Sequence, residues 1–219
     1  MGRAAVPFLA VRSTAGDPDV RFWATHLLGE LAYSESAEAV FKRLFDDAAP
    51  VRRVARRAAA ALILAGPTTE AWILPTLDRL ARSSTERAGR RLLAIETLGE
   101  LAMPKSVPVL IATLGETTAE LAEAAHRALV NITRHDFRRD ARQWNDWWVT
   151  NATRSRIEWL IDALLSESPT LRRAAAEELA PIVGRDLGYY DDLPEDEREA
   201  TQVRYVLWWE QEGRHKKRS

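Results

Sequence analysis

The four histidines are the first residues to weigh as metal ligands or catalytic bases, and their spacing supports neither role. His26, His126, His135 and His215 are scattered along the 219 residues, no two stand four residues apart, and no His-Glu dipeptide occurs. A protein metal site needs clustered His, Cys or carboxylate ligands. The chain contains no cysteine, which removes thiolate nucleophiles and disulfides and fits a reducing compartment. We therefore expect no metal and no cofactor.

Other arrangements that could do chemistry are also absent from the sequence. Asp186 and the pair Asp191-Asp192 are carboxylates that a general acid would require, yet helix capping and solvation explain them more simply. No glycine-rich phosphate loop and no Gly-x-Ser-x-Gly elbow occurs. The sequence therefore predicts a protein that is not an enzyme.

The composition is that of a folded chain without a strong overall charge. Hydrophobic residues make up 46%, charged residues 29%, and the formal net charge is −1, so no global field draws the chain toward nucleic acid or an anionic membrane. No apolar run reaches the roughly 18 residues that a membrane-spanning helix needs. The first residues lack the apolar stretch of a signal peptide. We expect a cytoplasmic protein that does not insert into membranes.

An internal repeat organises most of the chain. The segment Leu28-Gly29-Glu30-Leu31-Ala32 recurs at 98–102, and alignment on this match reveals five copies of one helix, which start at Val20, Val51, Arg90, Leu121 and Leu171. Offsets 0, 4, 8 and 11 from each start lie on one helical face, so each copy should bury a stripe. Offset 4 is alanine every time, at Ala24, Ala55, Ala94, Ala125 and Ala175. We expect a neighbouring helix to come closest at this alanine.

A second amphipathic segment precedes each copy, so the repeating unit is a helical hairpin. These first segments cover residues 5–11, 37–45, 70–80, 106–114 and 156–164. One hairpin cannot cover its own apolar face, whereas stacked hairpins share a core. We predict an all-α fold of about eleven to thirteen helices. The expected architecture is a right-handed α-solenoid of about five hairpins within residues 1–183, with units at about 4–32, 37–63, 70–102, 106–133 and 154–183.

The residues around the first hairpin turn resemble a known family. Asp17-Pro18-Asp19-Val20-Arg21, followed by Ala24, Leu27-Leu28-Gly29 and Leu31, is similar to the HEAT repeat in its bacterial, phycobilisome-lyase-like form. In that family an arginine after the first valine ties down the preceding turn. The equivalent residues here are Arg21, Arg52, Arg91 and Arg172, and the fourth copy departs with Ala122. The resemblance covers about residues 4–183 and implies a binding scaffold of unspecified ligand. The di-iron hydroxylases of HEAT-like fold depend on repeated His-Glu pairs, which this chain lacks.

Two tryptophan-rich segments interrupt the repeat. Trp144, Trp147 and Trp148 lie in an insert at 134–151; Tyr205, Trp208 and Trp209 lie in a C-terminal capping module at 184–213, after an acidic stretch at 191–197. Both aromatic triplets have helical spacing. We expect at least one tryptophan of each adjacent pair to be buried against the preceding unit. An aromatic patch for base stacking or for a cation is the alternative. The basic tail at 214–219 is expected to be disordered.

The binding surface is predicted from offsets 2 and 6 of the second helices, which point away from the core stripe. By resemblance to HEAT-like solenoids, this face lines a concave surface. Mixed charge around two apolar residues favours a protein partner, because a phosphate-binding groove would repeat basic residues in every unit. Solvation alone also explains each charge. The predicted site consists of Phe22, His26, Arg53, Arg57, Leu92, Glu96, Arg127 and Arg173. Its expected partner is a protein, such as an amphipathic helix with an acidic edge.

Three functions therefore stay open after the sequence is read. The leading one is a protein-interaction scaffold. The second is a nucleic-acid-acting protein similar to the HEAT-like alkylpurine DNA glycosylases, which would use the tryptophans and the arginines at 52–57. The third is a lyase-like chaperone subunit similar to phycobilisome lyases. Because residues 4–11 open the first unit without a polar capping helix, we also expect the chain to be the C-terminal part of a larger protein.

Overall fold

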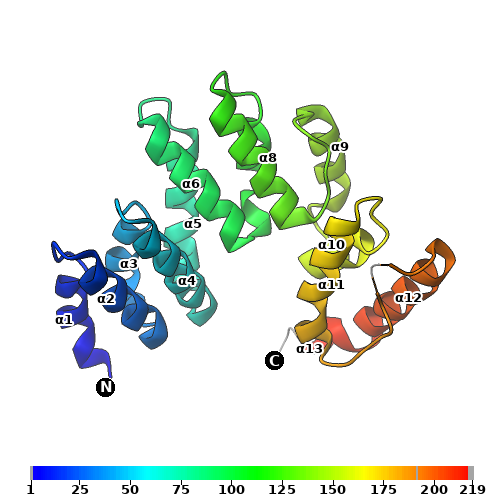
Figure 1. Cartoon of the computed structure of the whole chain (residues 1–219), viewed down its shortest axis with the longest axis horizontal. Helices are drawn as coiled ribbons and strands as arrows, with labels where there is room; N and C mark the ends of the chain where they lie inside the picture. The colour runs from blue at the N-terminus through cyan, green and yellow to red at the C-terminus, as the bar shows by residue number, and fades with distance from the viewer. Residues whose placement is uncertain (1, 191, 217–219) are drawn as a thin grey trace. The chain divides into compact units, whose positions relative to one another are not determined.

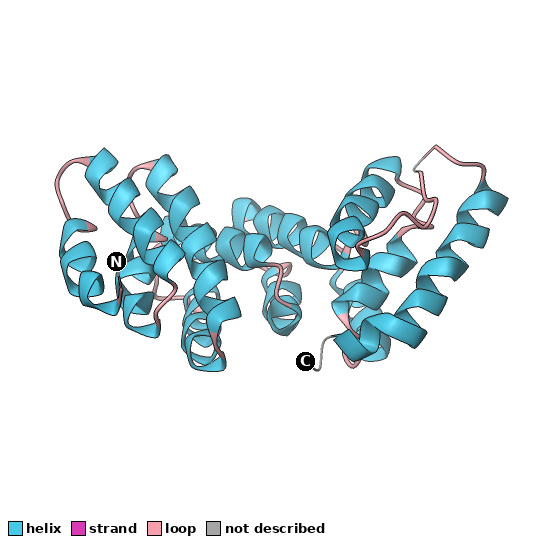
Figure 2. Cartoon of the chain, turned by 90° about the horizontal axis from the view of Figure 1, so that it is seen from below, coloured by secondary structure: helices cyan, strands magenta, loops and turns pink. Residues whose placement is uncertain are grey.

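The computed structural model describes residues 2–190 and 192–216, and this part of the chain is helical (Figures 1 and 2). Helices α1 to α13 are joined by short loops and turns, and the described residues contain no strand. The all-α prediction and the expected number of helices are confirmed. Met1, Asp191 of the acidic stretch and residues 217–219 of the basic tail lie outside the described residues. Within the described ranges, no helix is both long and apolar enough to cross a membrane.

The five predicted helical hairpins are all present. They are α1 (Val6–Arg12) with α2 (Pro18–Leu31), α3 (Ala37–Arg43) with α4 (Ala49–Ala65), α5 (Pro67–Arg82) with α6 (Ala88–Leu101), α7 (Val107–Thr113) with α8 (Ala119–Thr133), and α10 (Arg156–Ala163) with α11 (Pro169–Val183). Short 3₁₀ turns at Arg3–Ala5, Ser34–Ser36 and Pro104–Ser106 precede α1, α3 and α7. The tryptophan-rich segments form α9 (Ala141–Asn151) and α12 (Glu195–Trp208), and a π-helical turn at Trp209–Gly213 leads into α13 (Arg214–Lys216).

The chain divides into two compact units, residues 1–128 and 129–219, with the division inside α8. In the first unit α2 packs on α1 and α4, α4 packs on α3, α5 and α6, and α5 packs on α6 and α7. Second helices of consecutive hairpins therefore lie against one another in this unit. In the second unit α10 packs on α11 and α12. The boundaries that we placed between the repeat array and the capping module stay a prediction.

Part of the predicted apolar stripe forms the core, but offset 0 is buried only at Val51 and Leu121, and Arg90 at this offset is exposed. Offsets 4 and 8 are buried in all five second helices. Offset 11 is less regular, because Leu31 is half-buried and Ile182 is 40% exposed. At the end of α11 the next residue, Val183, is buried instead, in one cluster with Trp208 and Trp209 of the C-terminal segment. That segment therefore covers the side of α11 on which Val183 lies, and the burial expected for Ile182 was wrong.

Consecutive second helices come into close contact at a glycine. A Cβ atom on Gly29 would lie 2.6 Å from the Cβ and 2.8 Å from the Cα of Ala58. The equivalent atom on Gly99 would lie 2.8 and 2.9 Å from the Cβ and Cα of Ala128. Real side chains do not approach so closely, so the α2 and α4 backbones touch where Gly29 carries no side chain. The expectation that the alanine marks a close approach to a neighbouring helix stays a prediction.

The arginines after the first valine do tie down the preceding turn. Three times the guanidinium donates hydrogen bonds to the carbonyl oxygens six and five residues earlier: Arg21 to Ala15 and Gly16, Arg52 to Asp46 and Asp47, and Arg172 to Ser166 and Glu167. Arg91 differs, because it donates to the carbonyl oxygen of Ala81 and pairs with Glu116. These bonds satisfy carbonyl groups at the hairpin turns that would otherwise lack a partner.

Trp208 and Trp209 of the C-terminal segment are buried against the preceding hairpin. Their side chains belong to one apolar cluster with residues of α10 and α11, which confirms the prediction for this pair. The basic tail is helical at its start, where Arg214 pairs with Glu158 at 3.3 Å. The expected disorder was therefore wrong for residues 214–216.

The tryptophans of the insert pack differently. Trp147 and Trp148 are both half-buried, and their rings lie 5.1 and 6.0 Å from the ring of Trp159 in α10, which belongs to the following hairpin. The prediction for this pair was therefore wrong. The buried aromatic of the insert is Trp144, whose indole N–H donates to the carbonyl oxygen of Arg138 at 2.9 Å. A buried indole normally finds such an acceptor.

Candidate functional site

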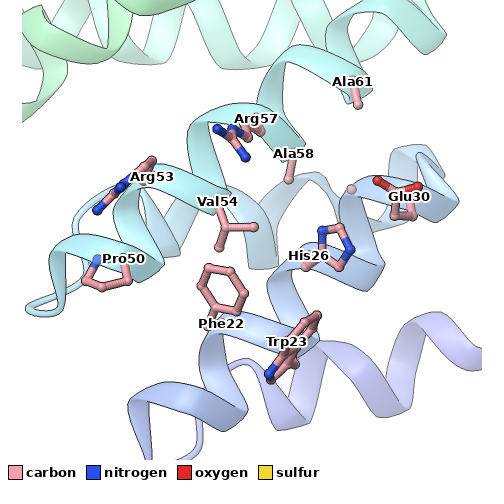
Figure 3. Close-up of a pocket in the computed structure, with 11 residues that line it drawn as sticks. Phe22, Trp23, His26, Glu30, Pro50, Arg53, Val54, Arg57, Ala58 and Ala61 are labelled. Atoms are coloured by element: carbon pink, nitrogen blue, oxygen red, sulfur yellow. The ribbon is translucent and has the colours of Figure 1, made fainter.

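Four of the eight predicted site residues line one pocket in the first unit. Phe22 and His26 come from α2, and Arg53 and Arg57 come from α4 (Figure 3). The pocket has a volume of about 490 Å³, within the roughly 300–1,000 Å³ that is typical of ligand-binding clefts. The other lining residues are Trp23, Gly29, Glu30, Pro50, Val54, Ala58 and Ala61.

The pocket owes its existence to small residues on both helices. Gly29 of α2 touches Ala58 of α4, so the two backbones converge on one side of the pocket. Ala61 lies one turn further along α4 and adds little volume. In Figure 3 the ring of Phe22 faces Val54, and His26 lies beside Ala58. The floor of the pocket is therefore apolar, and the larger side chains form its rim.

Three aromatic rings form one wall of the pocket. The ring of Trp23 contacts Phe22 at 5.3 Å between centroids and His26 at 5.7 Å, both in edge-on geometry, which is a favoured aromatic arrangement. Trp23 is 60% exposed. The sequence interpretation missed this residue because it took the site from offsets 2 and 6, and Trp23 lies at offset 3. The signal that could have found it is its size, since no other copy has an aromatic at this offset.

Two of the four arginines of α4 are bonded within the protein, and the other two are not. Arg52 holds the preceding turn, and Arg56 pairs with Glu96 and Glu100. Arg53 and Arg57 are exposed and form no hydrogen bond or ion pair with any described residue. Only half of the basic stripe at 52–57 is therefore available to a ligand.

The charges of the pocket are arranged asymmetrically. Arg53 lies at one end in Figure 3, and Glu30 lies at the other end, near Ala61. Glu30 is exposed and has no ion-pair partner among the described residues. Because α2 and α4 both run from the arginine end to the Glu30 end, the pocket carries positive charge at one end and negative charge at the other. A ligand with one acidic end would be oriented by this difference.

The other four predicted residues do not reach the pocket. Leu92 is half-buried on α6, and Glu96 on the same helix is the partner of Arg56. Arg127 lies on α8 and pairs with Glu123 at 3.7 Å. Arg173 is exposed on α11 in the second unit. Four of the eight predicted residues therefore share one pocket, and the binding role of all eight stays a prediction.

The turn between α3 and α4 contains the most strongly perturbed carboxyl group. Burial raises the pKa of Asp46, but the hydrogen bonds from the Arg21 guanidinium and the Ala48 N–H outweigh this effect and lower the pKa to about 2. Asp46 also pairs with Arg43 at 2.8 Å. Both oxygens are thus used by the turn, and the group is structural. Among residues 2–190 and 192–216 no three His, Asp or Glu side chains are placed to hold a metal ion.

Comparisons with known proteins return only distant matches among solved structures. No family model matches the chain, and no curated relative matches it. A complex of CpcE and CpcF of phycocyanin lyase from Nostoc is 20% identical over 92% of this chain and 86% of that chain, with a TM-score of 0.46. Human deoxyhypusine hydroxylase in complex with glycerol is 16% identical over 95% and 97%, with a TM-score of 0.45. Computationally designed armadillo repeat proteins for modular peptide recognition are 16% identical over 92% and 98%, with a TM-score of 0.38. These are helical repeat proteins, and membership of the HEAT-repeat family stays a prediction.

Proposed function

We propose that this chain is a protein-interaction scaffold that binds a segment of a partner protein in the pocket between α2 and α4. The observation that carries the proposal is the combination of an apolar, aromatic wall with Arg53 and Arg57, which have no partner in the described part of the chain. An apolar anchor next to arginine is the usual composition of an interface hot spot. The proposed role is binding without a catalytic step.

The partner segment is expected to carry an apolar side chain and a carboxylate on the same face. The apolar side chain would lie between Phe22 and Val54, and the partly exposed ring of Trp23 would lose contact with water. A planar guanidinium binds a carboxylate with two parallel hydrogen bonds, which favours an acidic edge over Arg53 and Arg57. Glu30 would repel a carboxylate at the opposite end of the pocket. An amphipathic helix with an acidic edge meets these requirements.

The charge pattern favours this partner over nucleic acid. A groove that follows a phosphate backbone needs repeated basic residues without carboxylates between them. Here Arg52 and Arg56 are already bonded within the protein, and Glu30 lines the same pocket. The net charge of −1 gives no long-range attraction to phosphate.

Fluorescence anisotropy with a labelled peptide tests the proposal. The probe is a helical peptide with leucines at i, i+4 and i+7 and a glutamate edge, and its matched control has lysine in place of each glutamate. We expect the acidic peptide to bind the parent protein and the lysine peptide to bind at least about tenfold more weakly. Arg53→Glu with Arg57→Glu, and separately Trp23→Ala, should each weaken binding of the acidic peptide about tenfold or more.

The control variant is Arg79→Glu with Arg139→Glu, which makes the same change in net charge at two exposed arginines outside the pocket. It should bind the acidic peptide as the parent does. Circular dichroism and melting temperature establish that each variant is folded. Equal binding by the parent and by both pocket variants would show that the site lies elsewhere.

A further inference from the structure

A second surface without a partner lies on α12, in the other compact unit. Residues 196, 200, 203, 207 and 210 follow one another at intervals of four and three, so they share one helical face. Val203 and Leu207 on this face are 52% and 47% exposed. The opposite face of α12 is buried through Thr201, Tyr205 and Trp208. The helix is therefore fixed to its own unit by one face and presents a second apolar face to solvent.

Carboxylates surround this exposed apolar face. Asp196 and Glu199 lie on the N-terminal side of Val203, and Glu210 follows Leu207. All three are exposed, and none forms an ion pair or hydrogen bond with the residues that the structure describes. By contrast, Glu212 of the same segment is paired with Arg185. The exposed side of α12 thus combines two apolar side chains with unpaired negative charge.

We infer that α12 of a second copy of this chain is the segment that occupies the pocket between α2 and α4. The inference rests on the proposed function, because it names the partner of the same pocket. The two surfaces are complementary both in apolar character and in charge. Val203 and Leu207 would pack on the wall formed by Phe22 and Trp23, and the carboxylates beside them would meet Arg53 and Arg57. The pocket supplies the aromatic wall and the arginines, and α12 supplies the apolar side chains and the carboxylates.

Such a contact is heterologous, because two different surfaces of the same chain meet. Each open assembly then retains one unused pocket at one end and one unused α12 face at the other, so copies add head to tail and form either a ring or an open chain. One helix in one pocket is a small interface, for which we expect a dissociation constant on the order of 10 µM or weaker. The mass of the parent protein should therefore increase with concentration across this range.

Analytical ultracentrifugation of two variants, alone and mixed, tests this arrangement. The pocket variant is Arg53→Glu with Arg57→Glu, and the helix variant is Val203→Lys with Leu207→Lys. All four positions are exposed, so the folds should be kept. We expect each variant alone to be monomeric at concentrations at which the parent associates. An equimolar mixture should form a 1:1 dimer and nothing larger, because only one intact pocket and one intact helix face remain per pair.

Two controls have matched chemistry. Val149→Lys with Val11→Lys changes two apolar residues that are 81% and 69% exposed and lie outside the pocket, and Arg79→Glu with Arg139→Glu repeats the charge reversal outside the pocket. Both should associate as the parent does. A parent that stays monomeric at all concentrations, or variants that associate as the parent does, would overturn the inference.

The peptide experiment separates this inference from the proposed function. If the acidic peptide binds the parent and the pocket variant loses that binding while the parent stays monomeric, only self-association is wrong and the pocket takes another partner. If the peptide shows no dependence on the pocket residues, the proposed function fails, and this inference fails with it.

Discussion

Replacing Gly29 with alanine tests whether α2 and α4 are in direct backbone contact. The added Cβ would lie 2.6 Å from the Cβ of Ala58 and 2.8 Å from its Cα. The Cα belongs to the backbone of α4 and cannot rotate away as the end of a flexible side chain could. The two helices must therefore separate by several tenths of an ångström, and the core on both sides must adjust with them.

The expected magnitude comes from two opposing contributions. Forcing an extra carbon into a well-packed interface costs about 1–3 kcal/mol. Alanine in place of glycine inside a helix stabilises the folded state by up to about 1 kcal/mol, because glycine loses more backbone entropy on folding. We therefore expect Gly29→Ala to lower the free energy of unfolding by about 1–2 kcal/mol. The control is Gly89→Ala in α6, where the added Cβ meets nothing within 4 Å. That variant should gain up to about 1 kcal/mol.

Urea denaturation followed by circular dichroism measures both variants against the parent. A third variant adds Ala58→Gly to Gly29→Ala, which removes the contact at 2.6 Å and leaves the one at 2.8 Å. The second change should therefore cost less in this background than Ala58→Gly does alone, and the difference is the coupling energy between the two positions. If Gly29→Ala is as stable as Gly89→Ala, the helices do not touch here, and the explanation of the pocket floor fails.

Two further predictions concern buried polar groups. The pKa of Asp46 lies at about 2, below the value near 3.9 of an unfolded chain, so its ionised form contributes about 2 kcal/mol that is present above pH 4 and lost as the pH falls toward 2. About half of this contribution is lost between pH 7 and pH 3, so urea titrations should show that the parent loses about 1 kcal/mol more stability over this range than Asp46→Asn. Trp144 donates to the Arg138 carbonyl, whereas the indole N–H of Trp208 is buried without a partner among the described residues. Trp144→Phe should therefore cost about 1 kcal/mol more than Trp208→Phe in the same titration, and equal losses would contradict this reasoning.

Much of the fold follows from the helical period of the apolar residues. Offsets 4 and 8 hold apolar residues in every copy, and a period of 3.6 places them on one face, which is why all ten positions are buried. The period states which face is buried but not how closely two helices approach. Gly29 therefore drew no attention, although its missing side chain sets the distance between α2 and α4. The period also does not indicate whether a helix packs on the hairpin before it or after it. It therefore did not predict that Trp147 and Trp148 pack on the following hairpin.

The candidate site could be predicted in part, for a specific geometrical reason. Offsets 2 and 6 of the first two second helices converge because α2 packs directly on α4, and this brings Phe22 and His26 to Arg53 and Arg57. The same offsets on α6 lead away from the pocket. Trp23 was missed because it lies at offset 3, outside the offsets 2 and 6 from which the site was predicted, and all its equivalents in the repeat are apolar.

The two kinds of position in the repeat respond to different physical demands. Offset 4 must fit against a neighbouring helix, and it is alanine in all five copies. Offset 2 is exposed or half-buried in every copy, and its occupants are Phe22, Arg53, Leu92, Glu123 and Arg173, which share neither charge nor size. Because packing does not dictate the residue at such a position, its side chain is available for binding. An apolar side chain there is unfavourably exposed to water, and contact with a partner would remove that exposure. The pocket combines both kinds of position: its floor uses the small residues that allow α2 and α4 to touch, and its rim uses residues that differ from copy to copy. In a chain built from one repeated hairpin, we therefore expect specificity to reside in the departures from the repeat, and the repeat itself sets where those departures meet.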